Sequence, residues 1–323
     1  MRCTFVLAAV LVAVVAAGSQ PAMAQDYPSR PVHMIVPYAP GGPTDIRGRV
    51  VAAKLHDLTG QSVVVENRAG AGTLIGTRVV LQAPADGYTL LMQSSVMAIS
   101  QLTYKNPGYR MEDFKLIAPL GSAPFVLGAS NSVAAKTVPE LVAYAKANPG
   151  KLNNASLGAG GLSQLLIERF KAAANISIVD IPYGGSTPAL SALQGGTVQL
   201  FMDSLTSSVP AARAGQIHVL GVTSAKRLAQ ASDIPTFKEQ GYPTVVGGTW
   251  MAFFVSAKTP DPIVQKLRQV TTRAIASQDV KDRIQILGFE VWSESPQEFE
   301  TFMKEDFDLW EKDIKRLNLP LLD

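Results

Sequence analysis

The stretch of the chain best suited to hold an anion is a proline- and glycine-rich turn at residues 37–45, which reads PYAPGGPTD. A β-branched run at residues 32–36 precedes it, and a helical pattern begins at Thr44 or Asp45. Glycine lets the backbone come close to a ligand, and the first amides of a helix have no carbonyl partner within that helix. The turn can therefore bind a carboxylate or a phosphate, although a plain strand-to-helix connection capped by Asp45 would look the same.

Loops of the same kind follow other predicted strands. They are rich in glycine or in hydroxyl side chains, and they occupy residues 66–73, 93–95, 183–188 and 203–206, while a similar loop at residues 156–163 precedes a predicted helix. Open α/β sheets bind ligands outside the carboxyl ends of their strands, so we expect these loops to converge on one site. The candidate ligand-binding residues are Tyr38, Ala39, Gly42, Thr44, Asp45, Ala71, Gly72, Thr73, Ser94, Gly158, Gly160, Ser163, Gln164, Tyr183, Gly184, Asp203 and Ser204.

Candidates for catalysis are few. His33, His56 and His218 fall within a predicted strand, on the polar side of a predicted helix and at a strand start, where hydrogen-bonded or solvated roles are expected. The sequence has no HExxH, no GxSxG and no cysteine–histidine pair. Asp45 and Asp203 could serve an exported hydrolase as acid and base. A helix cap for Asp45 and a loop-orienting acceptor for Asp203 are simpler interpretations, so we predict no catalytic residue and keep the hydrolase as the alternative.

Cofactor and metal sites are not expected either. Gly70, Gly72 and Gly76 follow a predicted strand as in a dinucleotide-binding turn, but the third glycine falls one residue late. No glycine turn is followed by Lys-Ser or Lys-Thr, which excludes a P-loop. The histidines, carboxylates and single cysteine do not have metal-ligand spacing.

The N-terminus has the pattern of a secretory signal peptide. Arg2 precedes an apolar run at residues 5–17, and Ala22-Met23-Ala24 matches the small-x-small pattern of signal peptidase sites. The run is shorter than the roughly 20 residues of a membrane span, and no later segment reaches that length. The only cysteine is Cys3, inside this leader. We therefore expect cleavage after Ala24 and an exported chain without disulfides in a bacterial periplasm.

Composition and periodicity favour an α/β protein that binds no nucleic acid. The net charge is only +3 and the basic residues are scattered, whereas nucleic-acid binding needs a basic patch. With 47% hydrophobic residues the chain can bury a large core, and about 300 residues usually form two domains. Short breaks near residues 121–124 and 247–248 are expected hinges. Predicted strands at residues 32–36, 63–66, 89–92, 125–129, 178–182, 198–202, 218–223 and 251–255 alternate with amphipathic segments such as 47–58, 138–147, 164–174 and 263–276.

Short motifs occur in order along the chain after the leader: YPSRP (27–31), PYAPGGPTD (37–45), VVENRAGAG (64–72), DGYTLL (86–91), YGGSTPAL (183–190), MDSL (202–205), VTSAKR (222–227) and DIPT (233–236). Together they resemble the Bug family, the periplasmic solute receptors of tripartite tricarboxylate transporters. The resemblance implies a two-lobed, type II periplasmic-binding-protein fold, with a mixed sheet flanked by helices in each lobe. We assign residues 25–122 and 249–323 to lobe 1 and residues 123–248 to lobe 2.

The resemblance also implies a function. Such a receptor is expected to be a monomer that closes its lobes on a small organic acid, holds it largely through loop amides and water, and delivers it to the membrane subunits of the transporter. Residues 39–45, 71–73 and 94 would bind one end of the acid, and residues 158–163, 183–186 and 203–204 the other. A sensor that presents the closed receptor to a signalling partner would have the same sequence features.

One loop departs from the family pattern and bears on the ligand. In the family it usually reads Ser-x-Gly-x-Gly, followed after three residues by His, whereas here Gln164 takes the histidine position and Gly161 replaces a more common hydroxyl residue. A neutral amide donates a hydrogen bond but cannot become cationic, and glycine enlarges the pocket. Tyr38, Tyr183 and Trp250 could supply apolar walls, so an aromatic dicarboxylate such as terephthalate is as well supported as an aliphatic acid.

Overall fold

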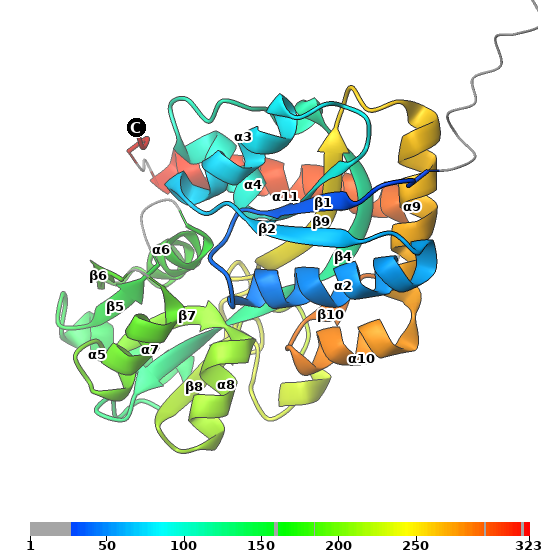
Figure 1. The fold of residues 1–323 in the computed structure, drawn as a ribbon. Coiled ribbons are helices and arrows are strands. Elements are labelled where there is room, and N and C mark those ends of the chain that lie inside the picture. Colours follow the sequence, from blue (N-terminus) through cyan, green and yellow to red (C-terminus); the bar gives the residue numbers. More distant parts are fainter. Residues whose placement is uncertain (1–26, 158–160, 184, 294, 318–319) are drawn as a thin grey trace, which may run out of the picture.

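The computed structural model describes residues 27–157, 161–183, 185–293, 295–317 and 320–323 (Figure 1). The predicted leader and the candidate site residues Gly158, Gly160 and Gly184 lie outside these ranges and stay predictions. The described chain forms mixed β-sheets flanked by helices, which confirms the predicted α/β class. Among its helices, none has both the length and the apolar character needed to cross a membrane.

The first sheet has a parallel and an antiparallel part. The parallel part has the order β2 (Val63–Asn67), β1 (Val32–Val36) and β3 (Thr89–Ser94). The antiparallel part consists of β9 (Gly248–Ser256), the first portion of β4 (Phe114–Ser130) and β10 (Glu290–Val291). Met34 and Val36 in β1 are fully buried, as expected for a parallel strand covered on both faces.

Helices cover both faces of this sheet. One face carries α2 (Pro43–Thr59), α9 (Asp261–Ala276) and α10 (Gln278–Ile286), and the other carries α3 (Leu74–Gln82), α4 (Val96–Thr103) and α11 (Pro296–Leu317). Two 3-10 segments, η1 (Ala71–Thr73) and η2 (Met111–Asp113), join these elements. The bounds of α2 follow from its sequence. Pro43 stands at the first helical position, where its missing N–H is not needed, and Gly60 ends the helix with a φ of 71°.

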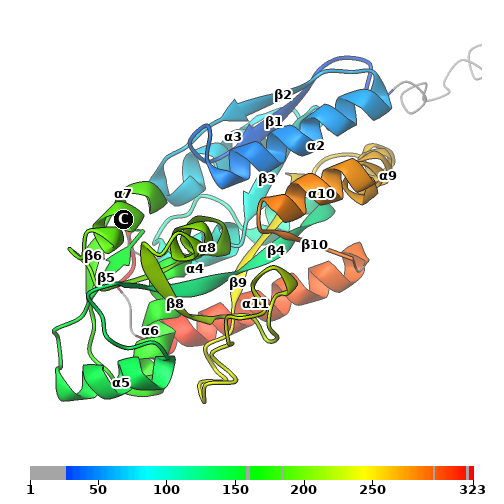
Figure 2. The ribbon, with the colours of Figure 1, turned by 90° about the horizontal axis from the view of Figure 1, so that it is seen from below.

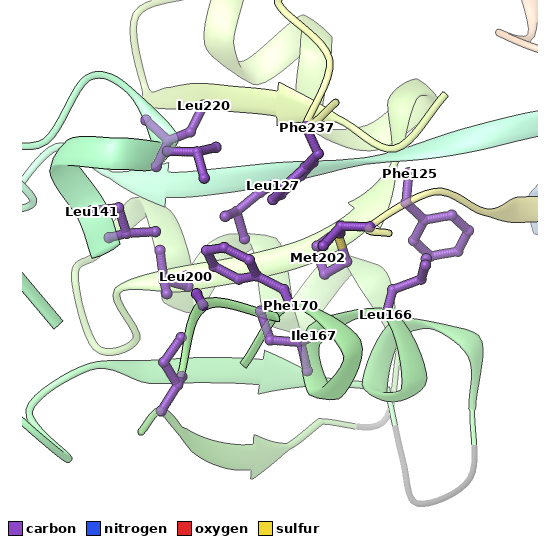
Figure 3. Close-up of a cluster of buried hydrophobic side chains, with 14 of the residues drawn as sticks. Phe125, Leu127, Leu141, Leu166, Ile167, Phe170, Leu200, Met202, Leu220 and Phe237 are labelled. Carbon is purple, nitrogen blue, oxygen red and sulfur yellow. The ribbon is translucent and has the colours of Figure 1, made fainter. Parts of the chain in front are cut away.

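The second sheet is centred on the last residues of β4. That part of β4 lies between β7 (Leu200–Ser204) and β8 (Ile217–Val222), and β5 (Asn153–Ser156) runs parallel to both β7 and β6 (Val179–Pro182). Around it lie α5 (Val138–Ala147), α6 (Leu162–Ala174), α7 (Ser186–Gln194), α8 (Leu205–Arg213) and η3 (Ala229–Ala231). The core beneath it contains Leu127, Phe170 and Phe237, and the two phenylalanine rings meet edge to face at 5.2 Å (Figure 3).

One continuous strand joins the two sheets. Residues 114–124 of β4 pair with β9, and residues 125–130 pair with β7 and β8. The register shifts between Leu116 and Ala118 and again between Pro119 and Gly121, where the backbone of β10 leaves no room for a side chain at Gly121. The strand therefore changes sheets between Pro124 and Phe125.

Helix α11 runs along both halves of the molecule (Figure 2). Phe299 near its start belongs to the core of the first sheet, whereas Trp310 and Ile314 near its end belong to the core of the second. Arg169 of α6 forms a buried ion pair with Asp313 of α11 at 2.5 Å. The predicted assignment of residues 249–323 to lobe 1 alone does not include this contact, and the lobe boundaries stay a proposal.

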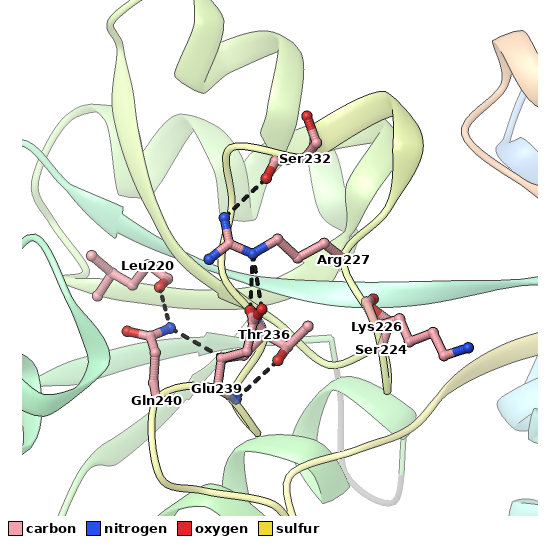
Figure 4. A network of polar contacts seen from close by, with 8 residues as sticks. All are labelled: Leu220, Ser224, Lys226, Arg227, Ser232, Thr236, Glu239 and Gln240. Atoms are coloured by element: carbon pink, nitrogen blue, oxygen red, sulfur yellow. Dashed lines mark hydrogen bonds and ion pairs between the residues drawn. The ribbon is translucent and has the colours of Figure 1, made fainter.

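The loop after β8 is held by its own polar network. Arg227 donates to the Glu239 carboxylate at 3.0 and 3.1 Å and to the Ser232 carbonyl at 3.0 Å (Figure 4). Thr236 and Glu239 each donate a backbone N–H to the other's side chain. The motifs at residues 222–227 and 233–236 thus shape this loop.

Candidate functional site

The carboxyl ends of β1, β2 and β3 bring three candidate loops to one edge of the first sheet. In the parallel register Val36 lies opposite Asn67, and Ile35 lies opposite Leu91. The turn at residues 37–45, the turn at residues 70–73 and Ser94 therefore begin side by side, as the sequence predicts.

The first of these loops is shaped by Asp45. Its carboxylate accepts the backbone N–H of Gly41 (2.8 Å), Nε of Arg49 (3.0 Å) and Nδ2 of Asn67 (3.0 Å). Burial would raise the pKa of Asp45, but these hydrogen bonds outweigh it and hold the pKa below its ordinary value. The predicted capping role is wrong, because Gly42 is the N-cap and Asp45 lies in the first turn. Asp45 positions the loop instead.

The second loop is a left-handed turn. The φ angles of Gly70, Ala71, Gly72 and Thr73 are 130°, 46°, 57° and 79°. For residues other than glycine such a conformation is strained by roughly 1–3 kcal/mol each, and strain of this kind is concentrated at functional sites. Ala71 and Gly72 are exposed, and successive N–H groups in a turn of this kind can form a concavity that binds an anion.

Tyr38 and Ser94 link the first loop to the end of β3. The Tyr38 hydroxyl lies 2.9 Å from Oε1 of Gln93 and 2.6 Å from Oγ of Ser94. Burial raises the pKa of Tyr38, so the phenol stays protonated and donates to Gln93. Gln93 was expected in a loop but lies inside β3. Of the remaining first-half candidates, Thr44 is buried in the first turn of α2 and Ala39 is exposed.

A second group of candidates meets at the carboxyl ends of β5, β6 and β7. Ser163 in the first turn of α6 donates its hydroxyl to the Met202 carbonyl at 2.5 Å, and Tyr183 donates its N–H to the Ser156 carbonyl at 2.8 Å. Gln164 and Tyr183 are partly buried beside them. The N-termini of α6, α7 and α8 therefore start from one edge of the second sheet.

Asp203 organises this edge as Asp45 organises the other. Its carboxylate accepts the hydroxyls of Ser186 (3.2 Å) and Ser207, and Ser207 also lies 3.1 Å from Oγ of Ser204. Burial raises the pKa of Asp203, while hydrogen bonds from Ser207, the Ser204 backbone and Ser186 oppose the rise. The predicted loop-orienting role agrees with these contacts.

The two groups of loops approach each other where the sheets join. Ile99 of α4, which follows Ser94, belongs to the same buried cluster as Leu162 at the start of α6. The carbonyl of Leu287 accepts Nη2 of Arg47 from α2 (2.8 Å) and the hydroxyl of Thr206 from α8 (3.1 Å). The candidate site therefore lies at the junction of the two halves.

Arg47 is a buried cation that was not among the residues predicted from the sequence. It is 3% exposed, lies over the Phe289 ring at 4.4 Å and forms no ion pair with any residue that the structure describes. Burial lowers its pKa to about 10, so the guanidinium stays charged at neutral pH. It gives the junction a positive charge. Its place on α2, two residues after the candidate loop, was the signal available in the sequence.

The remaining predictions concern the histidines, Trp250 and metal binding. His33 and His56 hydrogen-bond to Glu66 (2.5 Å) and to the Gln61 carbonyl (3.1 Å), and His218 contacts Lys136, which agrees with the hydrogen-bonded roles expected for them. Trp250 is 1% exposed in the core and donates to Asp306, so it offers no apolar wall. Within the described ranges no three His, Cys, Asp or Glu residues form a group that could hold a metal ion.

A cavity of about 860 Å³ at the hinge is a weaker candidate for an anion. Arg169 lines this cavity but already forms an ion pair with Asp313, and Arg316 forms a second ion pair with the same carboxylate. The charged groups around it are Arg169, Lys312 and Arg316 against Glu290, Glu305, Asp306 and Asp313. A carboxylate would meet unfavourable charge.

Several known proteins are similar to this chain in fold and in sequence. Residues 48–319 match the family described as the tripartite tricarboxylate transporter family receptor. The chain is 33% identical over 314 residues to BugT of Bordetella pertussis, covering 96% of both. In the structure of R. palustris Rpa4515 with adipate, the protein is 32% identical in sequence to this chain. The two structures have a TM-score of 0.84, and the match covers 92% of this chain and 100% of Rpa4515. MatC from Rhodopseudomonas palustris with bound malate is 30% identical, with a TM-score of 0.80 over 89% of this chain and 100% of that one.

Proposed function

The chain belongs to the tripartite tricarboxylate transporter receptor family, as its motifs indicate, and we propose that it captures a small dicarboxylate in the periplasm. It would then deliver the acid to the membrane subunits of a tripartite tricarboxylate-type transporter. Adipate and malate, held by two similar proteins, are aliphatic examples of the ligand class. Terephthalate represents the aromatic alternative.

The observation that carries this proposal is the gathering of backbone N–H groups at the ends of both sheets. The turn at residues 70–73 and the N-terminus of α2 lie on one side, and the N-termini of α6, α7 and α8 lie on the other. Helix N-termini carry partial positive charge and unpaired N–H groups, which favour a carboxylate. The buried charge of Arg47 between the two sides adds to the attraction for a dianion.

Backbone groups are better suited than the nearby hydroxyls to bind the acid. The single proton of Ser163 is donated to the Met202 carbonyl, so it is not available to a ligand carboxylate. Ser204 donates its proton to Ser207, because the single proton of Ser207 is donated to the Asp203 carboxylate. These side chains would hold the helix ends in place while the N–H groups make the contacts.

Lobe closure would supply the mechanism of capture. A ligand with one carboxylate on each lobe makes all its contacts only when the lobes approach, so its differential affinity shifts the population toward the closed form. Nothing favours the hydrolase alternative, because Asp45 and Asp203 direct their carboxylates at neighbouring loop donors and the family consists of transport receptors.

A thermal-shift screen of residues 25–323 with adipate, malate and terephthalate tests the proposal, with dimethyl adipate as an uncharged control. A ligand that binds only the folded state at 100 times its Kd stabilises it by ~2.7 kcal/mol, which raises Tm measurably. We expect at least one diacid to do so, with binding unchanged by EDTA in calorimetry. Stabilisation by the diester alone, or loss of binding with EDTA, would contradict carboxylate capture by amides.

A further inference from the structure

Gln93 makes four hydrogen bonds from a side chain that is fully buried in β3. Its Nε2 donates to the hydroxyls of Thr73 (3.0 Å) and Thr77 (2.9 Å). Its Oε1 accepts the Tyr38 hydroxyl (2.9 Å) and the backbone N–H of Ser94 (2.8 Å). Both N–H groups and both lone pairs of the amide are thus used. Its partners include residues from all three candidate loops of the first sheet.

The turn at residues 70–73 depends on such support. Thr73 has a φ of 79°, which a β-branched residue adopts only under constraint. Besides its bond to Gln93, the turn is held by the Thr77 hydroxyl on the Thr73 carbonyl (3.0 Å) and the Ser100 hydroxyl on the Gly72 carbonyl (3.1 Å). Strained backbone persists only where its surroundings over-determine it. Gln93 and Thr77 make two of these three side-chain hydrogen bonds.

A purely structural role does not explain where Gln93 stands. The preceding residues of β3, Leu90, Leu91 and Met92, are fully buried apolar side chains, so the burial of an amide after them depends on its hydrogen bonds. All four partners of the amide lie at the carboxyl edge of the sheet, where the candidate site is.

We propose that Gln93 is a positioning residue of the binding site. Its amide holds the turn at residues 70–73 and the Tyr38 loop in the arrangement in which their backbone N–H groups face the carboxylate, without touching the ligand. This inference rests on the proposed function for its consequence in binding, but not for its consequence in the ligand-free protein.

Pre-organisation has a kinetic signature. Without the amide the turn can relax, so only a fraction of molecules is competent to bind and the apparent Kd rises by the inverse of that fraction. This loss of affinity appears as slower association, whereas the loss of a direct ligand contact appears mainly as faster dissociation. We expect Gln93→Met to slow association at least about tenfold, equal to ~1.4 kcal/mol, and to change dissociation less than about twofold.

Two further variants separate positioning from general stability. Thr77→Val removes the neighbour that bonds both Gln93 and the turn, yet Thr77 is fully buried in α3 and is no ligand candidate. It should slow association in the same way, and Thr77→Ser should restore it. Gln240→Met is the matched control, because Gln240 donates to the Leu220 carbonyl at 2.9 Å (Figure 4) and accepts the Val138 N–H at 2.9 Å in the second half. It should lower stability without changing association.

Stopped-flow binding uses whichever of adipate, malate and terephthalate stabilises the wild type, and hydrogen exchange of the ligand-free protein provides the second measurement. The N–H groups of Thr73 and Leu74 donate to the carbonyls of Gly70 (3.0 Å) and Ala71, and both should exchange faster in Gln93→Met but not in Gln240→Met. Wild-type exchange at these amides overturns the proposal, as does a normal association rate in folded Gln93→Met and Thr77→Val. Failure of all three acids to bind the wild type defeats the proposed ligand class, while exchange still decides the role of Gln93.

Discussion

At the scale of single residues, the sequence predicts which loops meet at the edges of the sheets and the loop-orienting role of Asp203, but not the contacts of Asp45 or Ser163. Glycine and hydroxyl residues after strand ends marked the loops around Gly42, Gly72 and Ser204. The sequence could not show that the Ser163 proton is already donated within the protein, since its acceptor, Met202, is a backbone carbonyl 39 positions away. The sequence also predicts Gln93 in a loop rather than inside β3, because the hydrogen-bond partners of its amide are brought together only by the sheet.

Gly72 and Gly60 provide a matched test of the left-handed turn. Their φ angles are 57° and 71°, but a Cβ on Gly72 would lie 2.6 Å from the Tyr104 hydroxyl, whereas one on Gly60 would meet nothing within 4 Å. In urea unfolding, Gly60→Ala should lower the free energy of unfolding by about 1–2 kcal/mol because of φ alone. Gly72→Ala should lower the free energy of unfolding by more than Gly60→Ala does. It should also weaken the binding of adipate, malate or terephthalate in calorimetry. Equal affinity in the two variants would remove the turn from the site.

At the scale of elements, alternating β-branched and amphipathic segments predicted the strands near residues 32, 63 and 89 within a residue or two of their bounds. The first part of β4 was missed because Pro119, Gly121 and Pro124 are normally incompatible with a strand interior. The sheet accommodates them through register shifts next to Pro119 and through the change of partner after Pro124. Such accommodation depends on β9 and β10, which are distant in sequence.

The contact between α11 and β9 predicts a pH dependence of stability. Asp306 of α11 accepts Nε1 of Trp250 at 2.8 Å, and burial raises its pKa from 3.8 to about 6, with the Trp250 hydrogen bond and the Arg169 charge only partly opposing the rise. The folded state therefore binds the proton more tightly than the unfolded state. The resulting stabilisation is fully present below about pH 4 and is lost as the pH rises to about 6.

Asp306→Asn should remove this dependence while keeping an acceptor for Trp250. Between pH 4 and pH 7 we expect its unfolding free energy to gain up to ~3 kcal/mol relative to the wild type, from a shift of about two pKa units. Denaturant unfolding at several pH values measures the difference. A constant difference across that range would show that Asp306 is ionised normally in the folded protein.

At the scale of the whole molecule, the parts of the chain that join the two halves include β4 after Pro124, the chain returning at Gly247 and Gly248, and α11. The sequence predicted the first two as short breaks, because proline and glycine mark them. It could not predict the third, because the amphipathic pattern of α11 is the same whether one half or both lie beneath it. Contacts of Trp310 and Arg169 across the halves arise only from the fold.

If the halves move against each other to capture the ligand, a covalent bond between them should stop the motion. The turn after α10 touches α8: a Cβ on Gly288 would lie 3.1 Å from Oγ1 of Thr206 and 3.7 Å from its Cα. Residues 206 and 288 are therefore neighbours close enough to be tested as a cysteine pair, since a disulfide needs Cβ atoms about 3.5–4.5 Å apart. The only native cysteine, Cys3, lies in the predicted leader, so residues 25–323 offer no competing thiol.

The double variant Thr206→Cys with Gly288→Cys therefore tests the mechanism by small-angle scattering. In the wild type, adding a diacid that binds should lower the radius of gyration, because the lobes close around it. In the oxidised double variant the radius should not change, and dithiothreitol should restore the change in the same sample. Each single-cysteine variant should compact like the wild type whether oxidised or reduced. Compaction that survives in the cross-linked protein would mean that the halves close without separating at this junction. A wild type that binds the diacid without compaction would mean that the acid is held by one half alone.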